Sequence, residues 1–281
     1  MLRGLYTAAS GMITEQIRTD TIANNLANVN TNGYKKDELI SEEFESVLLH
    51  RINDGETPQN NISALQNIDT ARNYLLRGTV AADGGSGAPA IGTLGRGAKV
   101  AEVAVIRDQG ALENTGNKLD LAITGDGYFA INTPQGVRYT RDGNFYRSAA
   151  GQLVTANNQA VLNTTGGVIN IPPDTADINI GTDGTVNAGG QNLGQIELAG
   201  FADRGALLKE GNNLYRPQNG AQPQRAAGSV QQGWLERSNV NVAKEMVELI
   251  NNYRTYEADS KALVTQDSLL DKAVNDVGRV S

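Results

Sequence analysis

The sequence predicts a mainly β middle domain with long N- and C-terminal α-helices that pair as a coiled coil. Apolar residues recur at alternating steps of three and four near both chain ends, which is typical of paired helices. Between them, short alternating apolar runs are separated by Gly, Asn and Asp, which is typical of strands and turns. We therefore expect a helix within residues 1–33, a connector with a Gly-rich insert in 34–98, a β-rich domain in 99–238 and a helix within 239–281.

The C-terminal segment has the longest apolar repeat. Nine of the eleven positions at these steps between residues 242 and 277 are apolar, so the segment should lie along another helix. Asn241 precedes the first turn and should cap its free N–H groups, while Glu245 belongs to a charged face expected to contact solvent. The predicted apolar seam comprises Val242, Met246, Leu249, Tyr253, Tyr256, Leu263, Leu270, Val274 and Val277.

The N-terminal segment has the same spacing. Six of the eight positions between residues 2 and 26 are apolar and several are small, so a partner could approach closely. Gly33 is expected to supply the positive φ at which the helix stops. Two amphipathic helices on a globular core would give the same spacing, but little apolar sequence lies nearby to cover these seams, which favours pairing. The seam comprises Leu2, Leu5, Ala9, Met12, Ala23 and Leu26.

The middle of the chain is predicted to form mainly strands. Residues 39–80 could be helical or extended, and residues 78–97 contain seven Gly. From Lys99 onward, alternating runs follow one another at short spacing, and Gly125-Asp126-Gly127 separates two of them. Asp142-Gly143 is placed for the turn of a hairpin over residues 137–148. These features predict an all-β domain with many turns.

Composition and motifs exclude several function classes. A net charge of -7 argues against a nucleic-acid partner, because phosphate-binding surfaces need clustered Lys and Arg. His50 is the only His and has no apparent catalytic partner, so we expect no catalytic residues. The Gly-rich stretch 92–97 lacks the Gly-Lys-Ser/Thr ending of a phosphate loop, and no metal-ligand spacing is present, so we expect no cofactor and no metal. No apolar run is long enough for a secretory signal or a membrane span.

Both chain ends and the middle carry motifs of a known family. AASGM (8–12) with TIANNLANVNTNGYK (21–35), and LERSNVNVAKEMVELINNYRTYEADSKALVTQDSLL (235–270), resemble the terminal signatures of bacterial flagellar rod and hook proteins. TGNKLDLAITGDGYFAI (115–131) and YTRDGNF (139–145) resemble the β-domain of the same family. Tyr34 stands where Phe is commoner, and Asn241 and Lys244 stand where acidic residues are usual. The motif residues are Asn24, Asn25, Leu26, Ala27, Asn28, Gly33, Tyr34, Ser238, Asn239 and Val240.

The resemblance implies a non-enzymatic subunit of the flagellar basal-body rod. In such proteins the terminal helices form an inner tube and the β-domain an outer layer, and the tube transmits torque from motor to hook. The implied partners are copies of the chain, other rod and hook proteins and the flagellar type III export apparatus. The implied location is the basal body, outside the cytoplasm, reached without a cleaved signal peptide.

The long insert before Lys99 is most similar to that of the distal rod subunit, and a proximal rod paralogue is the alternative. A secreted β-rich enzyme or sugar-binding module is a second function class. It would need a concave site with converging polar groups, and the sequence indicates none.

Overall fold

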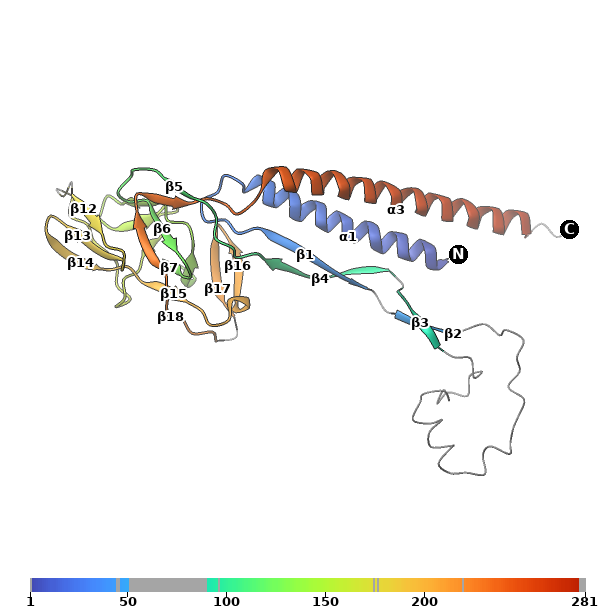
Figure 1. Cartoon of the computed structure of the whole chain (residues 1–281), viewed down its shortest axis with the longest axis horizontal. Helices are drawn as coiled ribbons and strands as arrows, with labels where there is room; N and C mark the ends of the chain where they lie inside the picture. The colour runs from blue at the N-terminus through green and yellow to red at the C-terminus, as the bar shows by residue number, and fades with distance from the viewer. Residues whose placement is uncertain are drawn as a thin grey trace, which may run out of the picture. The chain divides into compact units, whose positions relative to one another are not determined.

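In the part of the chain that the structure describes, the fold is mainly β with two long helices, as the sequence predicts (Figure 1). The chain divides into two compact units. Unit 1 comprises Met1–Ile17, Ile40–Glu102 and Tyr253–Ser281, and unit 2 comprises Arg18–Leu39 and Val103–Asn252. Each unit therefore contains a section of both helices. This computed structural model describes residues 2–43, 46–50, 90–95, 97–173, 175, 177–218 and 220–277.

The two long helices are α1, Leu2–Ala27, and α3, Val242–Val277. The Asn241 side chain accepts a hydrogen bond from the Lys244 N–H at 3.1 Å, which confirms the predicted cap. Contacts between α1 and α3 occur within both units, so the helices pack together. Within the described part of the chain, neither helix combines the length and apolar character needed to cross a membrane.

Gly33 has the predicted positive φ, at 66°, but its expected place at the helix end was wrong. The helix ends at Ala27, where the Asn28 N–H bonds to the carbonyl oxygens of Asn24 and Asn25, both at 3.1 Å. Gly33 instead allows a close approach of two backbones. A Cβ atom at this position would lie 2.5 Å from the carbonyl carbon of Arg141, so only Gly fits.

Two pairs of strands lie in the connector region. Strand β1 pairs with β4, and β2 pairs antiparallel with β3, so the first part of the ambiguous region is extended. Residues 51–89, which hold most of the predicted Gly-rich insert, lie outside the described residues, as does the side chain of His50. The bounds are β1 Asp37–Glu43, β2 Ser46–His50, β3 Ala90–Gly95 and β4 Ala98–Val105.

The largest sheet belongs to unit 2 and, among the described residues, has nine strands. Its main path is β16-β17-β8-β7-β11-β10-β9, and β15 pairs with both β7 and β18. The bounds are β7 Tyr128–Thr133, β8 Gly136–Thr140, β9 Phe145–Arg147, β10 Leu153–Thr155, β11 Ala160–Val161, β15 Leu198–Gly200, β16 Leu207–Gly211, β17 Leu214–Pro217 and β18 Gln224–Arg225.

Smaller sheets complete unit 2. Strands β12, β13 and β14 form one, β6 pairs with β19, and β5 pairs with β20. A short 3-10 helix, η2, covers Arg204–Ala206. The bounds are β5 Leu112–Asn114, β6 Leu121–Thr124, β12 Ile178–Ile180, β13 Thr185–Ala188, β14 Gln191–Gln195, β19 Ser229–Gln232 and β20 Trp234–Glu236.

Alternating side chains of these strands form the core of unit 2. The main cluster centres on Phe129 and Phe145, whose rings meet edge to face with centroids 5.1 Å apart. A second cluster includes Tyr128, Tyr139 and Tyr215. Burial of these aliphatic and aromatic side chains is the main favourable contribution to the stability of the domain.

The predicted hairpin at Asp142-Gly143 was wrong. Strand β8 before it pairs with β7 and β17, and strand β9 after it pairs with β10. Gly143 is needed for a different reason, since a Cβ atom there would lie 1.6 Å from the carbonyl oxygen of Leu121. The Asp-Gly pair therefore allows two backbones to approach closely and does not return the chain into a hairpin.

Candidate functional site: a buried polar junction

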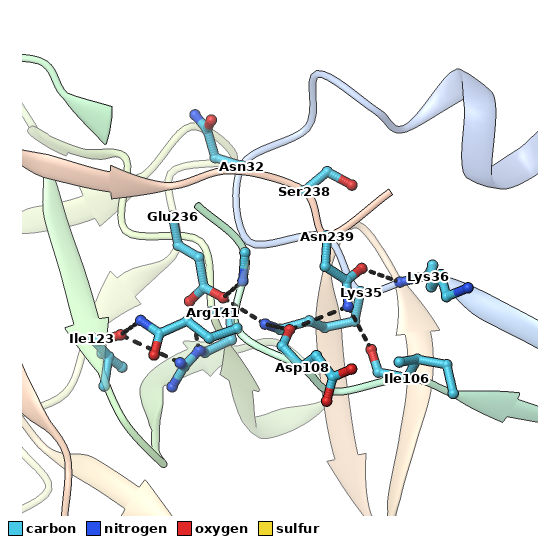
Figure 2. A network of polar contacts seen from close by, with 12 residues as sticks. Asn32, Lys35, Lys36, Ile106, Asp108, Ile123, Arg141, Glu236, Ser238 and Asn239 are labelled. Atoms are coloured by element: carbon cyan, nitrogen blue, oxygen red, sulfur yellow. Dashed lines mark hydrogen bonds and ion pairs between the residues drawn. The ribbon is translucent and has the colours of Figure 1, made fainter. Parts of the chain in front are cut away.

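A buried carboxylate joins three distant parts of unit 2 (Figure 2). Glu236, at the end of β20, accepts hydrogen bonds from Lys35 Nζ at 2.5 Å and from Arg141 Nε at 2.8 Å. It also accepts the Gly110 N–H at 2.9 Å. The exposed fractions are 1% for Lys35 and Glu236 and 5% for Arg141. The carboxylate is thus surrounded by donors and shielded from water.

The two cations outnumber the carboxylate, and backbone carbonyls accept hydrogen bonds from further donors of both cations. Arg141 donates to the carbonyl oxygens of Gly127 at 2.6 Å and Gly125 at 2.8 Å. Lys35 Nζ donates to the Asp108 carbonyl at 2.7 Å. Burial lowers the pKa of the Lys35 ammonium, and the Glu236 carboxylate opposes this shift. Such a network stabilises one arrangement of the chain only while every member is present.

Asn25 forms a second node of the junction. Its Oδ1 accepts the Asp37 N–H at 2.9 Å and the Tyr34 hydroxyl at 3.1 Å. Its Nδ2 donates to the Asp37 carbonyl at 2.8 Å and to Glu245 Oε2 at 3.2 Å. One buried amide therefore connects the end of α1, the start of β1 and the first turn of α3, which explains the need for Asn at this motif position.

Tyr34 packs beneath a third, partly buried cation. Lys209 Nζ lies 4.2 Å from the centroid of the Tyr34 ring and donates to Asp37 Oδ1 at 2.8 Å. Burial raises the pKa of the Tyr34 hydroxyl, and the nearby Asp37 carboxylate adds to the shift. Burial also lowers the pKa of Lys209. The ring thus shields the cation on one side, as in other cation–π contacts.

Asn239 connects the chain before α3 to the same junction (Figure 2). Its Oδ1 accepts the Lys36 N–H at 2.8 Å, and its Nδ2 donates to the Ile106 carbonyl at 2.8 Å. Ser238 Oγ accepts the Val240 N–H at 3.3 Å, which shapes the backbone immediately before the helix. The motif residues of both chain ends therefore converge on one structure in unit 2.

The geometry of the junction fits a structural role. Its charged groups form hydrogen bonds with one another or with backbone carbonyls. The neighbouring pocket has a volume of about 190 Å³, and Lys35, Arg107 and Arg141 are among the residues that line it. No group of three metal-ligating side chains occurs among the described residues. The family motifs contain Lys35, Arg141 and Glu236, but their pattern in the sequence did not predict that these three residues form a site. The one signal that could have identified them is a charged residue next to the residues of a buried strand.

The predicted seam residues on α3 fall into two groups. Leu249, Tyr256, Leu263 and Leu270 are partly buried, whereas Val242, Met246, Tyr253 and Val274 are exposed. Val277 is helical, but its side chain lies outside the described residues. Glu245, which was expected to contact solvent, is only 2% exposed, so that expectation was wrong. It is buried because Asn25 and Lys36 provide polar partners.

The predicted seam residues on α1 are mostly half-buried. Leu5, Ala9, Met12 and Leu26 are partly buried, Ala23 is exposed, and the side chain of Leu2 lies outside the described residues. Of the motif residues, Asn25, Gly33, Tyr34 and Val240 are buried, whereas Leu26, Asn28, Ser238 and Asn239 are partly buried and Asn24 and Ala27 are exposed.

The junction gives a sharp test at Asn25. Asn25→Asp removes the donor to the Asp37 carbonyl and places a carboxylate against that of Glu245. We expect unit 2 to lose about 2–3 kcal/mol of unfolding free energy at neutral pH. Urea unfolding followed by the fluorescence of Trp234, the only Trp, measures this loss. The control is Asn24→Asp, an exposed neighbour with the same effect on the helix dipole. Equal losses in both variants would contradict the role assigned to Asn25.

Comparison with known proteins identifies the family. A model described as flagella basal body rod protein matches residues 5–35, one described as flagellar hook protein FlgE/F/G D1 domain matches 122–188, and one described as flagellar basal body rod FlgEFG protein C-terminal matches 231–276. Lys35, Arg141 and Glu236 each fall in a different one of these regions. The junction therefore joins the three parts by which the family is identified.

Curated relatives match along almost the whole chain. The flagellar basal-body rod protein FlgG of Bacillus subtilis is 37% identical, with 98% of this chain and 99% of the relative covered. FlgG of Borreliella burgdorferi is 36% identical over 98% of both chains, and FlgF of Caulobacter vibrioides is 31% identical over 100% of both. These are structural rod proteins, which confirms the prediction of a non-enzymatic subunit. The chain belongs to the flagellar basal-body rod protein family and is a structural subunit of the bacterial flagellar rod.

Proposed function

We propose that this subunit is of the distal type and assembles with copies of itself into a helical tube that transmits torque from motor to hook. Relatives called FlgG support the distal type. The match to a FlgF protein supports a proximal paralogue as the second candidate.

Exposed apolar side chains on both helices carry this proposal. On α1, Tyr6 and Ile13 are 69% and 60% exposed and lie seven residues apart, hence on one face. On α3, Ile250 and Val264 are 53% and 63% exposed and lie fourteen residues apart, beside exposed Met246 and Tyr253. Large apolar groups in rows are unfavourable in water, so they suit contact with further helices. Identical subunits joined by contacts that do not close would form a helical tube.

The same assembly gives a role to each proposed region. Residues 1–33 and 239–281 would form the inner tube, with α1 and α3 paired as a coiled coil, and the predicted seam residues would contribute to its contacts. Residues 34–98 would act as a connector, and 99–238 would form the outer β-layer. The polar junction would then hold the ends of both helices to the β-domain.

The wider partners and the location follow from family membership. We propose contacts with other rod and hook proteins, export by the flagellar type III apparatus without a cleaved signal peptide, and a position in the basal body outside the cytoplasm. The chemistry of the exposed rows supports contacts with helices of similar subunits, because both would present apolar side chains.

Electron microscopy of the full-length chain at high concentration tests the assembly. We expect filaments or stacked tubes from the unmodified chain and none from Val264→Lys. The Lys ammonium would lose its hydration when a neighbouring subunit covers this position. Thr265→Lys is the matched control, since Thr265 is exposed on the next position and lies off the apolar row. Discrete monomers at every concentration, or filaments from Val264→Lys, would contradict the proposal.

A further inference from the structure

One row of α3 that contacts α1 is polar. Glu245, Asn252, Asp259 and Gln266 occur at intervals of seven residues, so they share one face of the helix. Glu245 and Asn252 are 2% and 4% exposed, and Asp259 and Gln266 are partly buried. Burying four polar side chains in one row costs free energy unless each has a specific neighbour.

In unit 2 the first two members have such neighbours on α1. Glu245 Oε2 accepts a hydrogen bond from Asn25 Nδ2 at 3.2 Å. Asn252 Nδ2 donates to Thr19 Oγ1 at 2.5 Å. The order of contacts is reversed along the two helices, so within this unit α1 and α3 run antiparallel.

In unit 1 the other two members lie against glycines. A Cβ atom on Gly11 would lie 2.6 Å from Asp259 Oδ2, and one on Gly4 would lie 3.0 Å from Gln266 Cδ. The two glycines are seven residues apart, as are their polar neighbours. The helices are antiparallel in this unit too, and the glycines leave the space that the polar side chains occupy.

A second row of α3 is apolar and cannot by itself select one alignment of the two helices. It consists of Leu249, Tyr256, Leu263 and Leu270, all partly buried. A slide of one heptad would replace one large apolar residue by another, at little change in buried apolar area. A polar side chain in such a seam stabilises less than an apolar one but distinguishes the correct alignment from the others.

We propose that the row Glu245, Asn252, Asp259 and Gln266 sets the register and antiparallel orientation of α1 and α3. A slide of seven residues separates Asn252 from Thr19 and Glu245 from Asn25, and so leaves buried polar groups without these partners. The register in turn would determine which exposed apolar side chains of α1 and α3 are presented together to neighbouring copies. Only this last step rests on the proposed function.

Cysteine cross-linking tests the register cleanly, because the sequence contains no Cys. Gly11→Cys with Asp259→Cys reports the observed alignment, and Gly4→Cys with Asp259→Cys reports a slide of one heptad. Both pairs are treated with a short bifunctional maleimide, in dilute protein and in pelleted assemblies. With Asn252 present we expect the first pair to exceed the second by about tenfold or more. In Asn252→Leu, which keeps the Asn25–Glu245 contact, this ratio should fall by at least about threefold.

Asn251→Leu is the matched control, since it makes the same change at an exposed neighbouring position and should keep the tenfold preference. An undiminished preference in Asn252→Leu, or equal yields from both pairs with Asn252 present, would overturn the inference. Filament formation is scored separately by electron microscopy. Filaments with an unchanged cross-linking preference in Asn252→Leu would overturn the register role alone, whereas a retained register without filaments would count against the proposed assembly.

Discussion

Glu236→Gln is expected to destabilise unit 2 by about 3–5 kcal/mol, because it leaves two buried cations without their counter-charge. The carboxylate accepts from Lys35, Arg141 and the Gly110 N–H. An amide has one oxygen, so its NH₂ group must face at least one of these donors. The free energy of unfolding can be measured by urea titration with Trp234 fluorescence as the probe, since Trp234 lies in the same strand.

Glu113→Gln is the matched control for this change. Glu113 lies on β5, the strand paired with β20, and contacts Arg237 at 2.9 Å with both side chains exposed. An exposed ion pair contributes at most about 1 kcal/mol, so this variant should unfold almost as the unmodified chain does. A Glu236→Gln variant that also loses less than about 1 kcal/mol would show that the junction does not stabilise the fold.

Leu263→Asp is expected to abolish assembly without altering unit 2. Leu263 is partly buried on α3 within unit 1, about one helical turn from Asp259 and Gln266, which lie against α1. A carboxylate there must lose hydration or separate the helices, at a cost of several kcal/mol. Sedimentation and electron microscopy should show no polymer, while the thermal unfolding of unit 2, followed by Trp234 fluorescence, should stay within error of the unmodified chain.

Ala258→Asp controls for the added charge, because Ala258 is an exposed residue of the same helix. It should assemble normally. Polymer from Leu263→Asp in normal yield would show that the predicted seam does not carry assembly. A parallel loss of the Trp234 transition would show that the helix pair and the β-domain are one cooperative structure.

Local patterns in the sequence were sufficient to predict the two terminal helices and the strand-rich middle of the chain. A repeat of three and four residues depends only on which side chains share a helix face, so both helices could be predicted. The Asn241 cap acts on the first turn and was also predictable. Asp142-Gly143 was misread because a Gly required for a close backbone approach and a Gly required for a hairpin look the same in sequence.

Which face of α3 is buried could be decided only with the partner helix in place. Apolar spacing favoured Met246 and Tyr253, both of which are exposed, and treated Glu245 as solvated. Glu245 is buried because α1 presents Asn25 there, and Asp259 fits because α1 presents Gly11. A pattern that counts apolar residues cannot detect a polar side chain whose partner lies on another helix.

The sequence alone determined the family, the two terminal helices and the β-rich middle, because each is encoded by residues close together along the chain. Only the tertiary structure decided that Lys35, Arg141 and Glu236 meet in one buried junction. A charged residue is stable in a protein interior only beside its counter-charge and donors. Here those partners come from three distant segments, so which charges are buried depends on how the whole of unit 2 folds.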